Sequence, residues 1–165
     1  MGMHLQIRYL LLCISLLLPN AIASASEAKR GAYFGAMATE YPAWFKDSFL
    51  NLRDDIKEAQ HAKKRVMLLI TQDNCPYCNA LIERNLAQKD IETLMQQNFD
   101  VIAINVWGDR EVIGLDGAKH TEKSFAAALK VQFTPTLLFV DETGKTILRL
   151  NGYLPLASAG AWAAR

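Results

Sequence analysis

Two short apolar runs mark the centre of the chain. The segments 65–71 and 99–106 are mostly apolar, and each has the length of one strand. Apolar runs of this length are typical of parallel strands that are buried on both faces of a sheet. Two more strand-like segments, 136–141 and 145–150, flank a turn that contains Gly144, so we expect them to form a hairpin.

Helical periodicity fills the segments before and between these strands. From about Ala43 to Lys64, apolar residues recur every three or four positions and predict one amphipathic helix. Its apolar stripe consists of Phe45, Phe49, Leu52, Ile56 and Ala59. Further helices are predicted at 79–88 and 90–98, from Thr121 onward, and at 156–165.

The order of these elements indicates an α/β fold. A strand–helix–strand unit implies a parallel pair of strands joined by a right-handed crossover, and the closing hairpin adds antiparallel strands. We therefore predict a central mixed sheet of about four strands flanked by helices, with an extra helix on the N-terminal side.

The first 25 residues have the pattern of a cleavable export signal. His4 and Arg8 give a weakly positive start, the run 9–18 is apolar but short for crossing a bilayer, and small residues follow it. An uncleaved membrane anchor is the alternative. The predicted organisation is a signal peptide at 1–25, an irregular arm at 26–45 and one domain at 46–165.

The charge balance argues against one broad class of partner. The 165 residues contain 18 Lys and Arg and 17 Asp and Glu, with no basic cluster. A balanced chain of this kind gives no electrostatic reason to expect nucleic acid binding. Hydrophobic residues make up 51% of the chain, which is enough for one domain with a real core.

Cys75 and Cys78 carry the candidate chemistry. They follow the first apolar strand directly and open a predicted helix. The unpaired N–H groups and partial positive charge at a helix N-terminus favour a thiolate, which is the form that attacks disulfides. Pro76 is tolerated there because a first-turn N–H has no partner within the helix. The spacing predicts a redox dithiol, with a structural disulfide or half a zinc site as the alternative.

Removal of the signal would discard Cys13 and leave Cys75 and Cys78 as the only cysteines. A secreted domain stapled by disulfides would need more cysteines, spread further apart. Export combined with one such pair therefore indicates catalytic or electron-carrying thiols.

The run Cys75-Pro76-Tyr77-Cys78 after a core strand, together with Thr134-Pro135 before a hairpin, resembles the thioredoxin superfamily. The resemblance covers roughly 47–153 and implies the thioredoxin fold. It assigns nucleophilic attack to Cys75 and resolution to Cys78, with Pro76 and Tyr77 completing the active-site motif. It also implies that Pro135 is a cis-proline lying against the cysteines, and that Thr134 offers backbone hydrogen bonds to a substrate strand.

Within the superfamily, the chain is similar to exported thioredoxin-like proteins of bacterial sulfur-oxidation clusters. The similarity rests on the cysteine motif, the glycine-rich connection before Thr121 and the run 151–155. Two positions depart from the thioredoxin pattern, since Leu69 replaces a buried Asp and Asn74 replaces a Trp. The first departure removes the usual proton acceptor for the resolving thiol. Glu83 is expected to face solvent, so the sequence identifies no general base.

The resemblance implies thiol–disulfide exchange with no metal and no cofactor beyond the Cys75–Cys78 disulfide. We expect a monomeric periplasmic reductase whose substrate is a disulfide-bonded exported protein. Pro-Tyr is the glutaredoxin pair, and the segment 88–133 has no room for the helical domain that exported oxidases insert. An oxidase or isomerase is the alternative. A membrane thiol–disulfide transporter of the cytochrome-biogenesis type is the implied electron donor.

The segment 107–120 supports two interpretations. It follows the second strand of a parallel pair, so it emerges at the same sheet edge as the loop that carries Cys75. Its apolar residues would form a partner-recognition lip, which makes Trp107 a candidate substrate-binding residue, or the segment would form a hairpin that closes over the sheet edge. The proposed lip consists of Trp107, Val112, Ile113 and Leu115.

Two other function classes compete with the redox interpretation. One is metal delivery, for which His120 is the only candidate ligand after the cysteine pair. The other is a binding module of the same fold with inert thiols.

Overall fold

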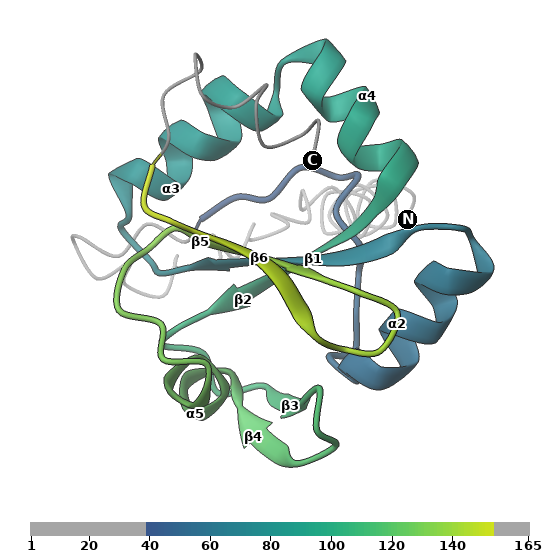
Figure 1. Cartoon of the computed structure of the whole chain (residues 1–165). Helices are drawn as coiled ribbons and strands as arrows, with labels where there is room; N and C mark the ends of the chain where they lie inside the picture. The colour runs from purple at the N-terminus through teal and green to yellow at the C-terminus, as the bar shows by residue number, and fades with distance from the viewer. Residues whose placement is uncertain (1–38, 154–165) are drawn as a thin grey trace, which may run out of the picture. The chain divides into compact units, whose positions relative to one another are not determined.

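The computed structural model describes residues 39–153. A four-stranded sheet in the order β2-β1-β5-β6 runs through this part of the chain (Figure 1). Strands β1 (Arg65–Thr71) and β2 (Phe99–Asn105) are parallel, whereas β5 (Thr136–Val140) is antiparallel to both β1 and β6 (Thr146–Asn151). The predicted mixed sheet with its closing hairpin is therefore confirmed.

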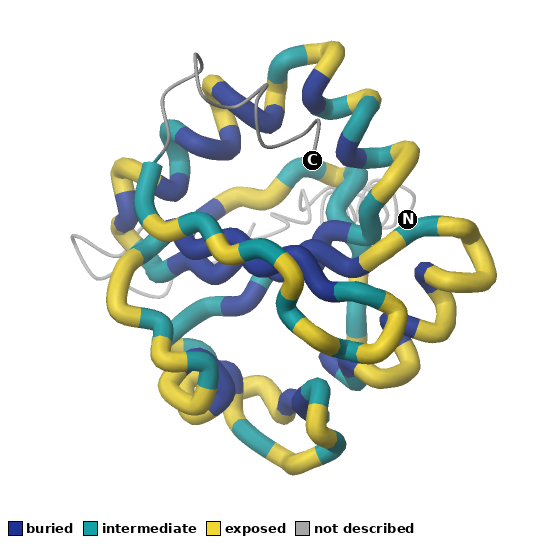
Figure 2. Tube along the Cα trace, viewed as in Figure 1, coloured by how far each residue is buried: buried dark blue, intermediate teal, exposed yellow. Residues whose placement is uncertain are grey.

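Alternate residues of the central strand β1 face two separate cores. Val66, Leu68 and Ile70 pack into one core, and Met67 and Leu69 pack into the other. All five are at most 1% exposed, and the central strands form the dark band of buried residues in Figure 2. Each such side chain contributes about 1.5–3 kcal/mol by leaving water. Burial on both faces explains why the strand sequence is apolar without alternation.

Helices cover both faces of the sheet (Figure 1). On one face lie α3 (Pro76–Ala80), the π-helical segment η2 (Leu81–Leu86) and α4 (Lys89–Asn98). On the other face lie α2 (Leu52–His61) and α5 (Glu122–Ala128). The crossover from β1 to β2 therefore contains the cysteine-bearing helix and covers one face of the sheet. The helix that precedes β1 lies on the other face.

The first predicted helix is shorter in the structure. It begins at Leu52, and the chain before it lies along the free edge of β2, where the N–H of Lys46 donates to the carbonyl oxygen of Val101 at 2.8 Å. Leu50 has a φ of 61°, a left-handed conformation that interrupts a right-handed helix. The predicted apolar stripe is consequently wrong at Phe49, which is fully exposed.

The segment after β2 forms a hairpin rather than a lip. Strands β3 (Glu111–Ile113) and β4 (Lys119–Thr121) pair in antiparallel fashion. Val112 is fully buried, and Leu115 packs against the core on the α2 side of the sheet. The lip hypothesis is therefore wrong for these two residues, whose side chains are taken up by packing. Trp107 is 63% exposed and remains accessible to a partner.

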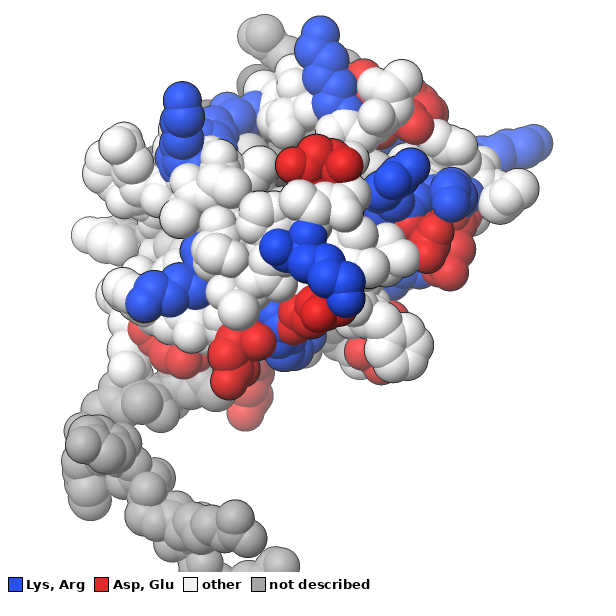
Figure 3. Space-filling view, turned by 90° about the horizontal axis from the view of Figure 1, so that it is seen from below, with Lys and Arg blue, Asp and Glu red and all other residues white. Residues whose placement is uncertain are grey.

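Charges of both signs are interspersed on the face seen in Figure 3, which looks at the molecule from the side of α5 and the hairpin. Ion pairs between opposite charges occur in the described residues, for example Lys119 with Glu111 at 3.1 Å and Arg65 with Glu142 at 2.9 Å. No extended patch of one sign appears on this face of the described residues.

Three predictions lie outside the described residues: the signal peptide at 1–25, the first part of the arm at 26–38, and the last helix at 156–165. Between residues 39 and 153, no helix combines the length and the apolar character that crossing a membrane requires.

Candidate active site

Cys75 and Cys78 form a disulfide at the start of α3, with their Cα atoms 5.2 Å apart. Cys75 is the N-cap residue in an extended conformation, and Pro76 is the first helical residue. Asn74 has a φ of 57°, a left-handed conformation that Asn adopts more readily than most residues. This turn brings the chain from β1 into α3 and places both sulfur atoms on the first helical turn.

The start of the helix places partial positive charge next to the Sγ of Cys75. The N–H of Cys78 donates to this Sγ at 3.0 Å. Helix α3 continues directly into η2, so the partial positive charge of a helical segment spanning 76–86 lies at Cys75. Cys78 is completely buried, whereas Cys75 retains 3% exposure. After reduction of the disulfide, this arrangement stabilises negative charge on Cys75.

The cysteine-bearing helix begins at Pro76 and Cys75 caps it, so the motif lies on the first helical turn, as predicted. Its second part is a π-helical segment, a rare conformation that the apolar periodicity of this segment does not predict. Glu83 is exposed, as predicted. Three apolar residues of this helical segment are buried and anchor it to the sheet: Leu81, Ile82 and Leu86.

The loop before β5 lies against the cysteine pair. The hydroxyl of Thr134 is 3.5 Å from the Sγ of Cys75. The Thr134–Pro135 peptide bond is cis, and Pro135 is buried. The N–H of Gly152 donates to the carbonyl oxygen of Pro135 at 2.7 Å, so the end of β6 holds this loop in place. The structure thus brings together residues that are 59 positions apart in the chain.

Exposed aromatic side chains lie on the segments that meet the sheet at the carboxyl ends of β1 and β2. Tyr77 is 62% exposed and stacks on Tyr153, with ring centroids 6.4 Å apart. Phe133, next to Thr134 in sequence, is also 62% exposed. Trp107 follows the end of β2, and the ammonium group of Lys123 lies 5.8 Å from the centroid of its ring. Exposed aromatic rings on rigid elements are well suited to contact a protein partner.

Leu69 occupies the position in β1 at which the resemblance to thioredoxins implies a buried carboxylate. Leu69 is completely buried in β1 and packs in the same core as the cysteine-bearing helix. Within residues 39–153, no group of three or more His, Cys, Asp or Glu side chains is arranged to hold a metal ion. His120 lies beside the ring of Phe125, with centroids 5.8 Å apart.

A polar network that sequence reasoning missed joins the cysteine loop to the end of β2. The side-chain amide of Asn105 donates from Nδ2 to the Oδ1 of Asp73 at 3.2 Å, and its Oδ1 accepts from the N–H of Trp107 at 3.0 Å. The N–H of Asn105 donates to the Oε1 of Glu122 at 3.0 Å. Three segments far apart in sequence therefore meet at one residue.

Glu122 is the buried centre of this network, with 2% exposure. Arg110 donates to its carboxylate from Nη2 at 2.7 Å and from Nε at 3.1 Å. The hydrogen bonds to Glu122 raise the pKa of Arg110. The available sequence signal was the Thr121–Ser124 capping box, which fixes the first turn of α5 and with it the place of Glu122.

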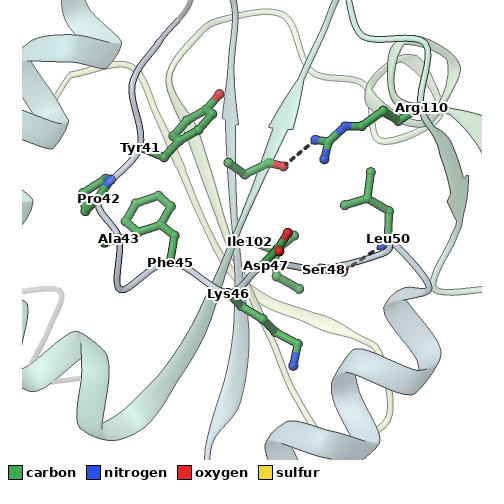
Figure 4. A pocket seen from close by; sticks show the side chains of 11 residues that line it. Tyr41, Pro42, Ala43, Phe45, Lys46, Asp47, Ser48, Leu50, Ile102 and Arg110 are labelled. Atoms are coloured by element: carbon green, nitrogen blue, oxygen red, sulfur yellow. Dashed lines mark hydrogen bonds between the residues drawn. The ribbon is translucent and has the colours of Figure 1, made fainter.

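A cavity of about 350 Å³ is lined by residues of the segment 41–50 and of β2 (Figure 4). Two cationic side chains that line it already form an ion pair or a hydrogen bond. Lys46 pairs with Glu58 at 2.6 Å, and Arg110 also reaches the carbonyl oxygen of Ala103 at 3.4 Å. Neither the cysteines nor the cis-proline loop lines this cavity, so it is separate from the candidate active site.

Residues 52–163 match the model of a thioredoxin-like domain. A thioredoxin-fold protein from Helicobacter pylori is 26% identical, with a TM-score of 0.53 over 62% of this chain and 70% of that chain. A thioredoxin from Thermus thermophilus is 24% identical, with a TM-score of 0.53 over 69% and 82% of the two chains. A disulphide isomerase from Xylella fastidiosa is 15% identical, with a TM-score of 0.53 over 78% and 97%. No curated protein matches the chain.

The family match covers more than half of the chain, and the mixed sheet and the cysteine pair at a helix start agree with it. The chain therefore belongs to the family of proteins with a thioredoxin-like domain.

Proposed function

We propose that this protein is an exported thiol–disulfide oxidoreductase that reduces disulfides in partner proteins. The observation that carries the proposal is the Cys75–Cys78 disulfide at the start of a helix, with the N–H of Cys78 and the hydroxyl of Thr134 both at the Sγ of Cys75. These contacts support a thiolate at the residue that a partner disulfide can reach first.

The exchange proceeds in two steps. The Cys75 thiolate attacks one sulfur of the partner disulfide, forming a mixed disulfide and releasing the other partner sulfur as a thiolate, which takes a proton from water. The Cys78 thiol then loses its proton, attacks the Sγ of Cys75 and releases the second partner thiolate. The partner gains two electrons and two protons, and the Cys75–Cys78 disulfide is regenerated.

Water is the proposed proton acceptor for Cys78. Leu69 cannot take a proton, and Glu83 is exposed on the outer side of the cysteine-bearing helix. We therefore expect the rate of the second step to depend on proton transfer to solvent water. It should not follow the ionisation of a buried carboxylate.

The proposed partner-binding surface comprises the cis-proline loop and the exposed aromatic rings at the same edge of the sheet. Thr134, next to the cis-proline Pro135, offers backbone groups to an extended partner segment, with Tyr77 and Trp107 as further contacts. The preference for a disulfide-bonded protein over a small thiol compound rests on these exposed rings.

Export and electron supply complete the proposal. The signal pattern at 1–25 supports a periplasmic location, where a reductase requires electrons from a membrane thiol–disulfide transporter. Membership of the sulfur-oxidation group stays a prediction from the sequence. The protein is proposed to act as a monomer and without a metal.

The reduction potential of the Cys75–Cys78 pair tests the direction. Related pairs range from about −270 mV in thioredoxin to about −120 mV in the strongest oxidants, which corresponds to roughly 7 kcal/mol. We expect a value near the thioredoxin end, together with reduction of insulin disulfides when dithiothreitol supplies electrons. A value near the oxidising end would instead support the oxidase or isomerase alternative.

A further inference from the structure

We propose that Asn105 is a positioning residue for the exchange reaction. Its side chain holds the turn that precedes Cys75 in a fixed position relative to the backbone of Trp107. This inference rests on the proposed function. The observation behind it is that the Asn105 side chain bonds in two directions, from Nδ2 to Asp73 at 3.2 Å and from the Trp107 N–H to Oδ1 at 3.0 Å.

The place of Asn105 in the sheet makes this bridge possible. It is the last residue of β2 and pairs in register with Thr71, the last residue of β1. The N–H of Val106 donates to the carbonyl oxygen of Thr71 at 2.9 Å. The segments that follow β1 and β2 therefore leave the sheet side by side. An Asn side chain here has both a donor and an acceptor at the length needed to reach each departing chain.

Glu122 holds the backbone of Asn105 through a separate hydrogen bond. Its buried carboxylate accepts the N–H of Asn105 and two N–H groups of Arg110. A buried carboxylate requires such donors, so this arrangement resists local movement. The bridge at Asn105 is therefore anchored to α5 and does not depend on the exposed loop alone.

The bridge has a chemical consequence for Cys75. Asp73 lies two residues before the nucleophile, and Asn105 fixes both the turn and the position of the Asp73 carboxylate. Loss of the bond removes the tie between this turn and the end of β2 and lets the turn that carries Cys75 move. Formation and alignment of the Cys75 thiolate should both suffer, while the sheet behind remains intact.

The test measures the rate at which iodoacetamide alkylates Cys75 in the reduced full-length protein at neutral pH, with the labelled site assigned by peptide mapping. Asn105→Ala and Asp73→Ala should each slow the reaction about three- to tenfold, as expected for one hydrogen bond. The double variant should be no slower than either single variant, because both remove the same interaction. Asp73→Asn, which keeps an oxygen acceptor, should recover most of the rate.

Asn98→Ala is the matched control, since Asn98 is exposed on α4 and makes a side-chain hydrogen bond to Leu94 at 2.8 Å. Wild-type rates in Asn105→Ala, or single effects that multiply in the double variant, would overturn the proposal. If Asn105→Ala fails to fold, Asp73→Ala decides alone, and an unchanged rate overturns the inference. Absence of insulin reduction by the wild type would defeat the proposed function but leave the coupling in alkylation rates intact.

Discussion

Asp55 is a buried carboxylate in the first turn of α2, and 6% of the residue is exposed. Burial raises its pKa, and the Ser48 hydroxyl, which donates at 2.6 Å, and Lys46, at 3.9 Å, only partly offset this. A folded-state pKa above the unfolded value means that the native state binds the proton more tightly. Ionised Asp55 therefore reduces the free energy of unfolding above its raised pKa, and this penalty disappears as the pH falls through that pKa.

Asp55→Asn should accordingly increase stability at about pH 7, and the gain should shrink toward about pH 4. The amide keeps an oxygen acceptor for Ser48 but has no charge to bury. Urea unfolding at several pH values measures the difference from wild type, with Asp90→Asn at an exposed position of α4 as control. A gain that stays constant with pH would show that the charge of Asp55 is not its cause.

The exposed side chain of Trp107 is a candidate contact for a partner protein. Trp107→Ala should lower kcat/KM for a protein disulfide roughly tenfold, because aromatic anchors dominate interface energetics. Reduction of a small aromatic disulfide should change little. Ile147→Ala, half exposed at the far end of β6, controls for loss of apolar surface. Equal losses with both substrates would mean that Trp107 acts on the thiols rather than on partner binding.

The two faces of the sheet carry different parts of the candidate site. The cysteine-bearing helix occupies one face, and α5 on the other face holds Glu122 under the connection that follows β2. Gly108 belongs to that connection, and its N–H donates to the carbonyl oxygen of Asn105 at 2.9 Å. A methyl group on Gly108 would overlap the carboxylate of Glu122. A side chain at this position is therefore incompatible with the buried carboxylate.

Gly108→Ala should lower the free energy of unfolding by about 1–3 kcal/mol, the usual range for an overpacked site. The cost should shrink in a Glu122→Ala background, where the overlapping carboxylate is absent. Urea denaturation of the four proteins in this cycle measures the coupling. The same cost in both backgrounds would place the origin of the effect elsewhere in the loop.

For the whole molecule, the sequence was informative where local pattern and burial agree. The apolar runs of β1 and β2 predicted a doubly covered sheet, and the cysteine spacing predicted the disulfide. Sequence reasoning failed where tertiary contacts override local periodicity. The left-handed Leu50 ends the predicted first helix early, and Val112 packs inward instead of facing a partner. The Asn105 network stayed hidden because its members come from segments that only the folded sheet brings together.

The proposed direction of electron flow also has a consequence for global stability. In a reductase the folded state favours the disulfide, so the oxidised protein should unfold at a higher urea concentration than the reduced protein. A Cys75→Ser/Cys78→Ser variant should show the same midpoint with and without dithiothreitol. Greater stability of the reduced form would indicate an oxidant and reverse the proposed direction.

The central claim is that Cys75 attacks a partner disulfide and Cys78 releases it. The most direct measurement mixes the reduced Cys78→Ser protein with a disulfide-bonded peptide and maps covalent adducts by mass spectrometry, which also separates Cys75 from Cys13. The account predicts a stable mixed disulfide at Cys75 that dithiothreitol removes, and none at Cys78 in the Cys75→Ser protein under the same conditions. Absence of an adduct at Cys75, or equal capture by either cysteine, would contradict it.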